Sequence, residues 1–414
     1  MWKNLIQEFL GDLSKQKLRS SLTIIAIAWG TLAVVLLMAF GRGVTSTMME
    51  GMRGGGDQVI MVFGGQTSQE FQGLRSGRSI QFVKEDVDML TQSVPGIAYS
   101  SPQYHQGGTQ LRTDHSTEVT HMEAVGPDFE IMRTVYPQPN GRFLNQKDIK
   151  EKRRVVFLGN EIAEDLFGEE DPIGRKVDID GMPFQVIGVM QEKLQTNMNY
   201  GPDSQRAIIP YSTYEAIYGN RNLNSILVRP ESPDAQPRVR DGINRTLAAK
   251  YRFDPEDNQA INVWDFVEME RINRQVSVGI EIFLFSVGFF TLLIAGVGVA
   301  NIMYVVVKER TREIGLKKAI GARRGHIVSQ FMFEAVAISF IGGLIGLGIS
   351  TLIVKGVLAL DFDEGAMEFL ATPELSGFVM AVTFGILAIL GLFAGIFPAV
   401  KASRLDPVES LRYE

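Results

Sequence analysis

Four long uncharged apolar runs constrain this chain more than any other feature. One lies near the front, at Leu22 to Phe40, and a long, mostly polar stretch follows it. The other three are Ile282 to Val307, Ala335 to Val354 and Leu375 to Val400. Each run matches or nearly matches the ~20 residues that a helix needs to cross a hydrocarbon core of ~30 Å. We therefore expect an α-helical membrane protein with four transmembrane helices, in 1 + 3 order, that anchors one large domain outside the bilayer.

The first run could also be a cleaved signal peptide, because the basic residues Lys15, Lys17 and Arg19 precede it. It is longer than the ~7–15 apolar residues of a signal core, and Ala39 to Arg42 make a poor cleavage site. We expect the run to be retained as a helix.

The segments that flank the apolar runs differ in charge, and the basic ones alternate with those that are not basic. Basic residues flank the first run, fill the loop after the second run and return in the tail, whereas the loop between the third and fourth runs is acidic. The basic residues are Lys3, Lys15, Lys17, Arg19, Lys308, Arg310, Arg312, Lys317, Lys318, Arg323, Arg324, Lys401, Arg404 and Arg412, and the acidic ones are Asp361, Asp363, Glu364, Glu368 and Glu374. By the positive-inside rule, both termini are cytoplasmic in the inner membrane and the polar stretch lies outside.

These observations predict a complete division of the chain. The segments are a cytoplasmic segment at 1–20, transmembrane helices at 21–41, 281–307, 327–355 and 375–400, an extracytoplasmic domain at 42–280, a cytoplasmic loop at 308–326, an extracytoplasmic loop at 356–374 and a cytoplasmic tail at 401–414.

The large domain has the pattern of a mixed α/β fold. Gly108 to Arg112 and Thr117 to Glu123 form one predicted hairpin, and a second turns at Asp180-Gly181. Asn160 is a predicted helix cap. We expect two subdomains, with about 100–220 inserted into the outer part.

Helical patterns cross both borders of this domain, at Gly41 to Met52 and at Trp264 to Ile280. They are either ordinary helix ends at the membrane surface or a stalk that carries movement. The pattern does not choose between these two.

Several kinds of chemistry have no signal in the sequence. There is no cysteine, and no segment fits a Walker A loop. The net charge of −6 without a basic stripe gives no reason to expect a nucleic acid. His105, His115 and His121 could meet at a metal, but exposed hairpin residues are the favoured interpretation. Glu334 sits at the edge of a span, where reaching cytoplasmic water or pairing with the basic loop is favoured over a buried switch.

Small-residue motifs occur in the last two spans. Gly342 and Gly346 form one Gly-x-x-x-Gly motif, and Gly391 and Gly395 form another. Such motifs allow helices to approach closely in lipid, and here they indicate either a contact between two copies or only the glycines that are common in such helices. Pro398 is expected to kink the last span.

The sequence of the basic loop is more regular than a loop needs if its charge only keeps it on the cytoplasmic side. Ile314, Leu316 and Ile320 place apolar side chains on a charged short helix that Gly321 is predicted to end. Such a helix suits docking to a soluble partner, with a plain positive-inside loop as the alternative.

Three separated motifs resemble one family. Glu309 to Ala322 and the tail Phe397 to Arg412 resemble the MacB-type ABC transporter permeases, which carry an FtsX-like permease domain. Leu158 to Gly168, Asp171 to Gly174 and Phe184 to Val189 are similar to the MacB-like periplasmic core domain.

The resemblance implies a permease subunit that pairs with a second copy, identical or related, and rests on a separate ABC ATPase. ATP and Mg would be bound by that ATPase, and this chain would have no catalytic or metal site and no cofactor of its own. The basic loop would be the coupling helix, with the coupling residues Arg312, Glu313, Ile314, Gly315, Leu316, Lys317, Lys318, Ile320 and Gly321. The family works by mechanotransmission on substrates already outside.

The sequence is compatible with more than one substrate class. Export of drugs, peptides or similar molecules, with an adaptor and an outer-membrane channel, is the leading hypothesis. The alternatives are release of lipoproteins and ATPase-driven activation of cell-wall hydrolases.

Overall fold

The computed structural model describes residues 17–56, 58–195, 199–360 and 372–406. It divides into a membrane unit, Met1–Thr47 with Gln275–Glu414, and an outer unit, Met48–Arg274. Several charges used for the orientation argument, among them Lys3, Lys15, Arg412 and the acidic residues at 361–368, lie outside the described residues.

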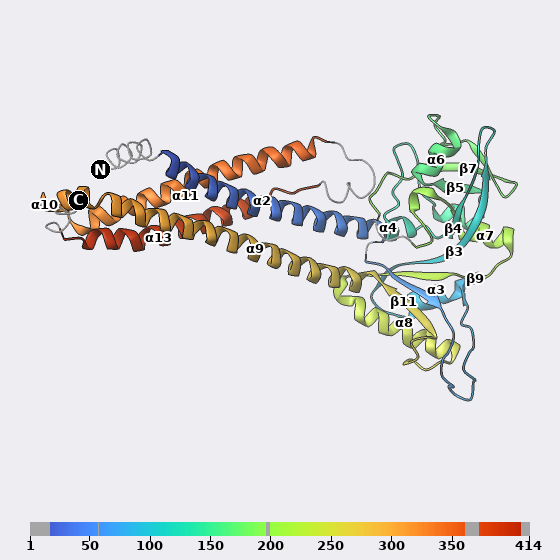
Figure 1. Ribbon diagram of the computed structural model, residues 1–414. Coiled ribbons are helices and arrows are strands. Elements are labelled where there is room, and N and C mark those ends of the chain that lie inside the picture. Colours follow the sequence, from blue (N-terminus) through green and yellow to red (C-terminus); the bar gives the residue numbers. More distant parts are fainter. Residues whose placement is uncertain (1–16, 57, 196–198, 361–371, 407–414) are drawn as a thin grey trace. The chain divides into compact units, whose positions relative to one another are not determined.

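Long apolar helices make up the membrane unit (Figure 1). They are α2 (Lys17–Gly54), α9 (Phe266–Glu309), α11 (Arg324–Leu358) and α13 (Gly377–Arg404), with the short α10 (Thr311–Ala319) between α9 and α11. Four of these helices are long and apolar enough to cross a membrane, which confirms the predicted number of spans.

Two of the helices extend well beyond their apolar runs. Helix α2 continues to Gly54, and α9 begins at Phe266. The sequence prediction that Trp264 starts this helix is wrong, because Trp264 lies in a strand opposite Met61 and packs on Phe63 with ring centroids 5.1 Å apart. Pro398 lies inside α13 without ending it.

The membrane unit has an apolar interior and an apolar exterior. Ile27, Leu292, Phe331 and Leu387, one from each long helix, are buried in a single cluster. Large apolar side chains such as Phe290 are exposed on the outside. Lipid is as apolar as the core, so such a surface is stable in a bilayer.

The outer unit is built on one sheet (Figure 1). Its strands are β1 (Ile60–Gly64), β3 (Ile97–Arg112), β4 (Thr117–Val125), β5 (Val155–Leu158), β6 (Lys176–Ile179), β7 (Met182–Val189), β8 (Arg206–Pro210), β10 (Ser225–Pro230) and β11 (Ile261–Asp265). A small separate pair joins β2 (Phe82–Val83) to β9 (Asn222–Leu223). The helices are α3 (Lys84–Ser93), α4 (Phe129–Arg133), α5 (Gln146–Lys150), α6 (Asn160–Phe167), α7 (Tyr211–Tyr218) and α8 (Gln236–Tyr251).

The nine strands follow the order β11-β1-β10-β3-β4-β8-β5-β7-β6. Strand β3 is long enough to serve both subdomains, since its first part pairs with β10 and its second part with β4. The tip of β3 also pairs with β6, Leu111 opposite Ile179. This last pairing closes the strands from β3 to β6 into a barrel, and the barrel is the inserted subdomain.

The local predictions for this unit are mostly correct. Strands β3 and β4 form the first predicted hairpin, and β6 and β7 form the second. Asp180 and Gly181 at the second turn have φ of 49° and 81°, as a tight hairpin turn requires. Asn160 does not cap α6, because Gly159 holds the cap position and Asn160 is already helical.

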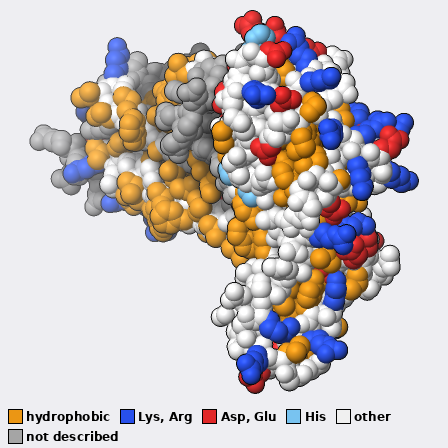
Figure 2. All heavy atoms as spheres, turned by 90° about the vertical axis from the view of Figure 1, so that its right-hand side faces the viewer, with side chains coloured by type: hydrophobic (Ala, Val, Ile, Leu, Met, Phe, Trp, Pro, Cys, Tyr) orange, Lys and Arg blue, Asp and Glu red, His pale blue; other side chains and the backbone are white. Residues whose placement is uncertain are grey.

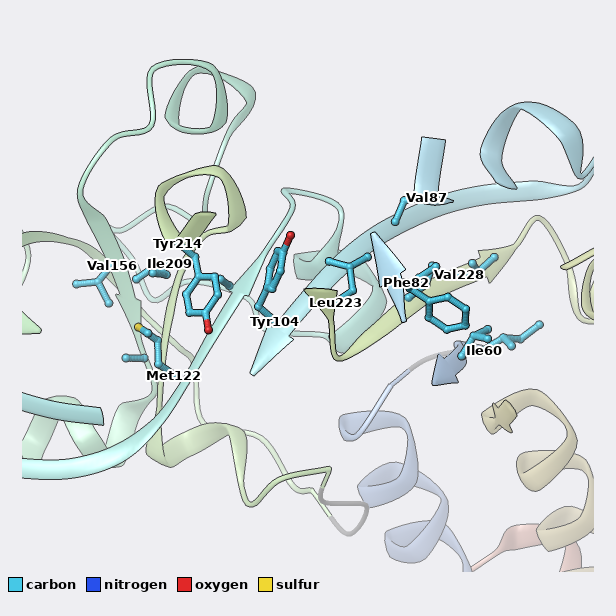
Figure 3. Packing of buried hydrophobic residues seen from close by; sticks show 14 of the residues in the cluster. Ile60, Phe82, Val87, Tyr104, Met122, Val156, Ile209, Tyr214, Leu223 and Val228 are labelled. Carbon is cyan, nitrogen blue, oxygen red and sulfur yellow. The ribbon is translucent and has the colours of Figure 1, made fainter. Parts of the chain in front are cut away.

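The two subdomains share a hydrophobic core (Figure 3). Phe82 and Val228 lie at one end of the cluster, Val156 and Ile209 lie at the other, and Tyr104 lies between them. On the surface of the outer unit, charged side chains of both signs are interspersed with apolar patches (Figure 2). A surface of this mixed kind is expected for a domain in water.

Candidate functional site

The basic loop folds into the short helix α10, whose end is fixed by a backbone motif. The N–H of Gly321 donates to the carbonyl of Lys318 at 3.0 Å. The N–H of Ala322 donates to the carbonyl of Lys317 at 3.0 Å. This pair of bonds is the Schellman arrangement, and it needs a left-handed residue at Gly321, where φ is +99°. Glycine adopts that conformation without steric cost, so the sequence itself dictates the end of the helix.

The apolar residues of α10 do not share one face. Ile314 is 3% exposed and packs in the membrane-unit core. Leu316 is 55% exposed and Ile320 is 79% exposed. The expectation that all three side chains are available to a partner is therefore wrong for Ile314, because its position on the helix turns it toward the core.

A lysine ties α10 to the end of α13. The Lys318 Nζ donates to the carbonyl of Ser403 at 3.0 Å and to the carbonyl of Leu405. Ser403 lies in the last turn of α13 and Leu405 is the residue that follows the helix, so Lys318 lies at the negative end of the helix dipole. Lys318 thus fixes the position of α10 from its inner side.

A second polar tie joins the start of α10 to α11. The Arg310 Nη1 lies 3.5 Å from the Glu334 Oε2, and both side chains are 11% exposed. This pair confirms that Glu334 is a partner of the basic loop, which is one of the two roles in the favoured interpretation. Removing one partner of so buried an ion pair is costly, because it leaves the other charge buried without a partner.

The opposite side of α10 is open. Arg312, Leu316 and Ile320 are spaced four residues apart, so they lie along one side of the helix, and all are exposed. Glu313 is exposed beside them, Lys317 pairs with it at 3.2 Å, and Gly315 is buried. The outward face therefore presents two apolar side chains bordered by charge.

The four packing glycines make contacts within the chain. A Cβ on Gly342 would lie 2.8 Å from Ile27 Cβ, and one on Gly346 would lie 2.4 Å from the Ala28 carbonyl, so both face α2. On α13, a Cβ on Gly391 would meet Ser339, and a Cβ on Gly395 would meet Ala335. Helix α11 is thereby packed closely against α2 and α13. These close approaches need no second copy.

The histidine cluster shows a stack of rings. His105 lies face to face with Tyr200, with centroids 3.8 Å apart, and 5.1 Å from the His121 ring. Burial, followed by the charges of His121 and Arg206, lowers the pKa of His105 to about 4. Among the described residues, no group of three or more His, Asp or Glu side chains could hold a metal ion.

Sequence reasoning missed the tie from Lys318 to α13, and it missed a buried charged cluster in the outer unit around Arg133, Lys193 and Asp203. The first could have been sought in the pairing of a lysine with a helix end. The cluster leaves no short-range signal, because its members are spread along the sequence.

Two curated proteins are similar in sequence to nearly the whole of this chain. The macrolide export ATP-binding/permease protein MacB of Bdellovibrio bacteriovorus is 32% identical over 97% of this chain and 60% of that protein. MacB 2 of Aeromonas hydrophila is 32% identical over 96% of this chain and 59% of that protein. This chain thus spans about 60% of the length of these curated relatives.

A crystal structure of the periplasmic region of MacB from Actinobacillus actinomycetemcomitans is also similar. It covers 54% of this chain and 96% of that chain, at 21% identity and a TM-score of 0.43. Two family models match, the MacB-like periplasmic core domain at residues 20–246 and the FtsX-like permease C-terminal domain at residues 285–407. The chain therefore belongs to the family of MacB-type ABC transporter permeases.

Proposed function

We propose that this chain is the permease subunit of a MacB-type ABC transporter, in which ATP hydrolysis by a separate ATPase subunit moves the outer domain. The curated relatives are named as combined ATP-binding and permease proteins, and this chain spans about 60% of their length. We propose that the ATPase of this transporter binds the ATP and Mg.

The outward face of α10 carries this proposal. On its inner side, Ile314 is buried and Lys318 donates to a carbonyl of α13. The Arg310–Glu334 pair lies nearby, at the start of α10. Leu316 and Ile320 remain exposed. Such a helix, fastened on one side and open on the other, suits transfer of movement from a docked ATPase into the membrane helices.

The outer domain would then do the work by mechanotransmission. The described membrane helices bury few charges, and one of these, Glu334 of α11, pairs with Arg310 at the start of α10. A polar substrate path through the helices would need polar groups inside the bundle.

The macrolide export names of the relatives favour export of drugs, peptides or similar molecules. We place the permease, paired with a second copy, in the inner membrane with both termini cytoplasmic, working with an adaptor and an outer-membrane channel.

Docking can be tested with Leu316→Asp combined with Ile320→Asp. Both side chains are exposed, so the fold should be retained, while two carboxylates would oppose an apolar contact. We expect at least a tenfold weaker association with the ATPase and loss of permease-dependent ATP hydrolysis, measured in nanodiscs. Ile314→Asp is unsuitable for this purpose, because it places a charge in the core.

The matched control is His326→Ala, an exposed position at the start of α11. It should bind the ATPase as the unmodified chain does. Unchanged association and ATP hydrolysis in the Leu316/Ile320 variant would contradict docking on this face.

A further inference from the structure

The end of α2 is held in a buried polar site of the outer unit. Helix α2 ends at Gly54, and the Gly54 carbonyl accepts a hydrogen bond from Lys193 Nζ at 2.8 Å. The next carbonyl, of Gly55, accepts from Arg133 Nη1. Carbonyls at the end of a helix have no partner within it and carry the negative end of its dipole. Two cationic side chains therefore cap α2.

A carboxylate holds these two cations in place. Asp203 Oδ1 lies 2.7 Å from Arg133 Nη2, and Asp203 Oδ2 lies 2.7 Å from Lys193 Nζ. Arg133 is 1% exposed and Asp203 is 2% exposed. Lys193 also donates to the Arg133 carbonyl at 2.7 Å. Both cations are thus fixed by several bonds at once.

This cluster has one more cation than carboxylates, and the end of α2 offsets part of that surplus. Arg206 joins it through Asp203 at 3.2 Å and through Glu123. The cluster then holds three cations, Arg133, Lys193 and Arg206, against the two carboxylates of Asp203 and Glu123. An unpaired buried charge is costly, so the partial negative charge of the α2 carbonyls stabilises the surplus cation.

The chain that follows α2 is a poor mechanical link. Residues 54–56 are all glycine, and Gly56 has φ of +148°. Glycines give the backbone its greatest freedom. This run leads to β1, at the other end of the sheet from the barrel. The polar contacts, by contrast, join the end of α2 to the inserted subdomain, which contributes Arg133, Lys193 and Asp203.

Close approach at Gly54 supports the same arrangement. A Cβ at this position would lie 1.9 Å from the carbonyl oxygen of Leu194, the neighbour of Lys193. The helix end therefore reaches the segment that carries Lys193 only because residue 54 has no side chain.

We propose that Arg133 and Lys193, held by Asp203, are positioning residues that fix the end of α2 to the inserted subdomain, so that movement of α2 reaches the barrel without being absorbed by the glycine run. This inference rests on the proposed function, in which movement passes from the membrane helices to the outer domain.

The test uses the full chain with its ATPase in nanodiscs. Spin labels at Glu50→Cys and Lys176→Cys, both exposed, report the distance from α2 to the barrel in a chain that has no other cysteine. Labels at Lys176→Cys alone, one on each of two paired copies, report the response of the barrels to ATP. The altered chain is Lys193→Met, which keeps the length of the side chain and removes its charge.

We expect a narrow Glu50–Lys176 distance distribution in the unmodified chain and one at least twice as broad in Lys193→Met. The ATP-dependent change between the barrels should fall at least fivefold, while ATP hydrolysis persists. Lys193→Arg should restore the narrow Glu50–Lys176 distribution and the ATP-dependent change between the barrels. Lys250→Met is the control, since Lys250 pairs with Asp86 outside the cluster and makes no bond to Gly54 or Gly55 among the described contacts.

Gly54→Ala provides a second variant in which every charge is retained. Its Cβ should displace the end of α2 and produce the same broadening, even where Lys193→Met fails to fold. A folded Lys193→Met or Gly54→Ala chain with the unmodified distances would overturn the inference. If the barrels of the unmodified chain show no response to ATP, the proposed function fails, and the Glu50–Lys176 distribution alone then decides the inference.

Discussion

His105 shows how a single side chain in the outer unit makes stability depend on pH. Its ring lies between those of Tyr200 and His121, and its Nδ1 is buried without a hydrogen-bond partner among the described residues. A charged imidazolium is disfavoured there, so the pKa of His105 falls to about 4. The unfolded chain, with a pKa of about 6.5, therefore takes up a proton at a higher pH than the folded chain does.

The stability that His105 contributes should be lost as the pH falls from about 6.5 to about 4, because the unfolded state binds the extra proton across that window. The ring is half-buried, so solvent screening limits the loss to about 1–2 kcal/mol. Urea unfolding at pH 7 and at pH 4.5 would measure it. His105→Phe should flatten this difference, and an equal dependence on pH in both chains would contradict the assignment.

Asp203 titrates outside this window. Burial alone would raise the pKa of Asp203, but the nearby Arg133, Lys193 and Arg206 outweigh burial and hold the pKa well below its ordinary value. Its contribution is present above pH ~4 and is lost only in stronger acid. Burial raises the pKa values of Glu123, Asp128 and Glu130, so the contribution of His105 is the difference between the pH dependence of the unmodified chain and that of His105→Phe.

The sequence predicts a residue's backbone conformation correctly where that conformation depends on the residue's neighbours along the chain. Gly321 ends α10, and Asp180-Gly181 forms the turn between β6 and β7, because each conformation depends on a few adjacent residues. The burial of Ile314 could not be predicted, since the short α10 has apolar residues on more than one side. The contacts of Arg133 with Asp203 depend on tertiary structure alone.

At the scale of helices, close packing around α11 gives a sharp comparison. Gly346→Ala would place a Cβ 2.4 Å from the Ala28 carbonyl of α2. Backbone cannot yield as a flexible side chain can, so we expect α2 and α11 to separate at a cost of about 1–3 kcal/mol. Thermal unfolding of the purified chain in detergent would show the lower Tm.

Gly348 is the matched control, two residues away on the same helix. A Cβ there would meet nothing within 4 Å. Gly348→Ala should leave the Tm unchanged or raise it slightly, because alanine favours the helix. Equal Tm values for the two variants would show that the contact with α2 is not close.

The existence of the membrane helices could be predicted from the sequence, but their full extents could not. Uncharged runs of sufficient length identify the spans. Helix α2 continues to Gly54 and α9 begins at Phe266, so each helix includes polar residues beyond its apolar run. Trp264 instead joins a strand, where pairing with Met61 overrides a local helical pattern.

At the scale of the whole molecule, the proposed orientation can be checked by labelling. Asp114→Cys lies in an exposed turn of the outer unit, and Ala319→Cys lies on the exposed side of α10. A maleimide that cannot cross membranes should label the first in intact spheroplasts and the second only after permeabilisation. Each label is unique in this chain, since it has no cysteine. The reverse pattern would contradict the charge argument.

The α/β character of the outer unit and its two subdomains could be predicted from strand patterns and turns. Closure of the barrel could not, because it pairs Leu111 of β3 with Ile179 of β6. Such pairings between distant segments leave no periodic signal in the sequence.

The shared strand β3 has a thermodynamic consequence for the outer unit. One sheet runs through both subdomains, and one apolar cluster extends from Ile60 to Val156. If the barrel unfolded, β3 would lose its pairing with β4, and apolar surface of the other subdomain would be exposed to water. Neither subdomain therefore keeps its stability without the other. The two subdomains therefore melt together, as a single cooperative unit, although one interrupts the other in sequence.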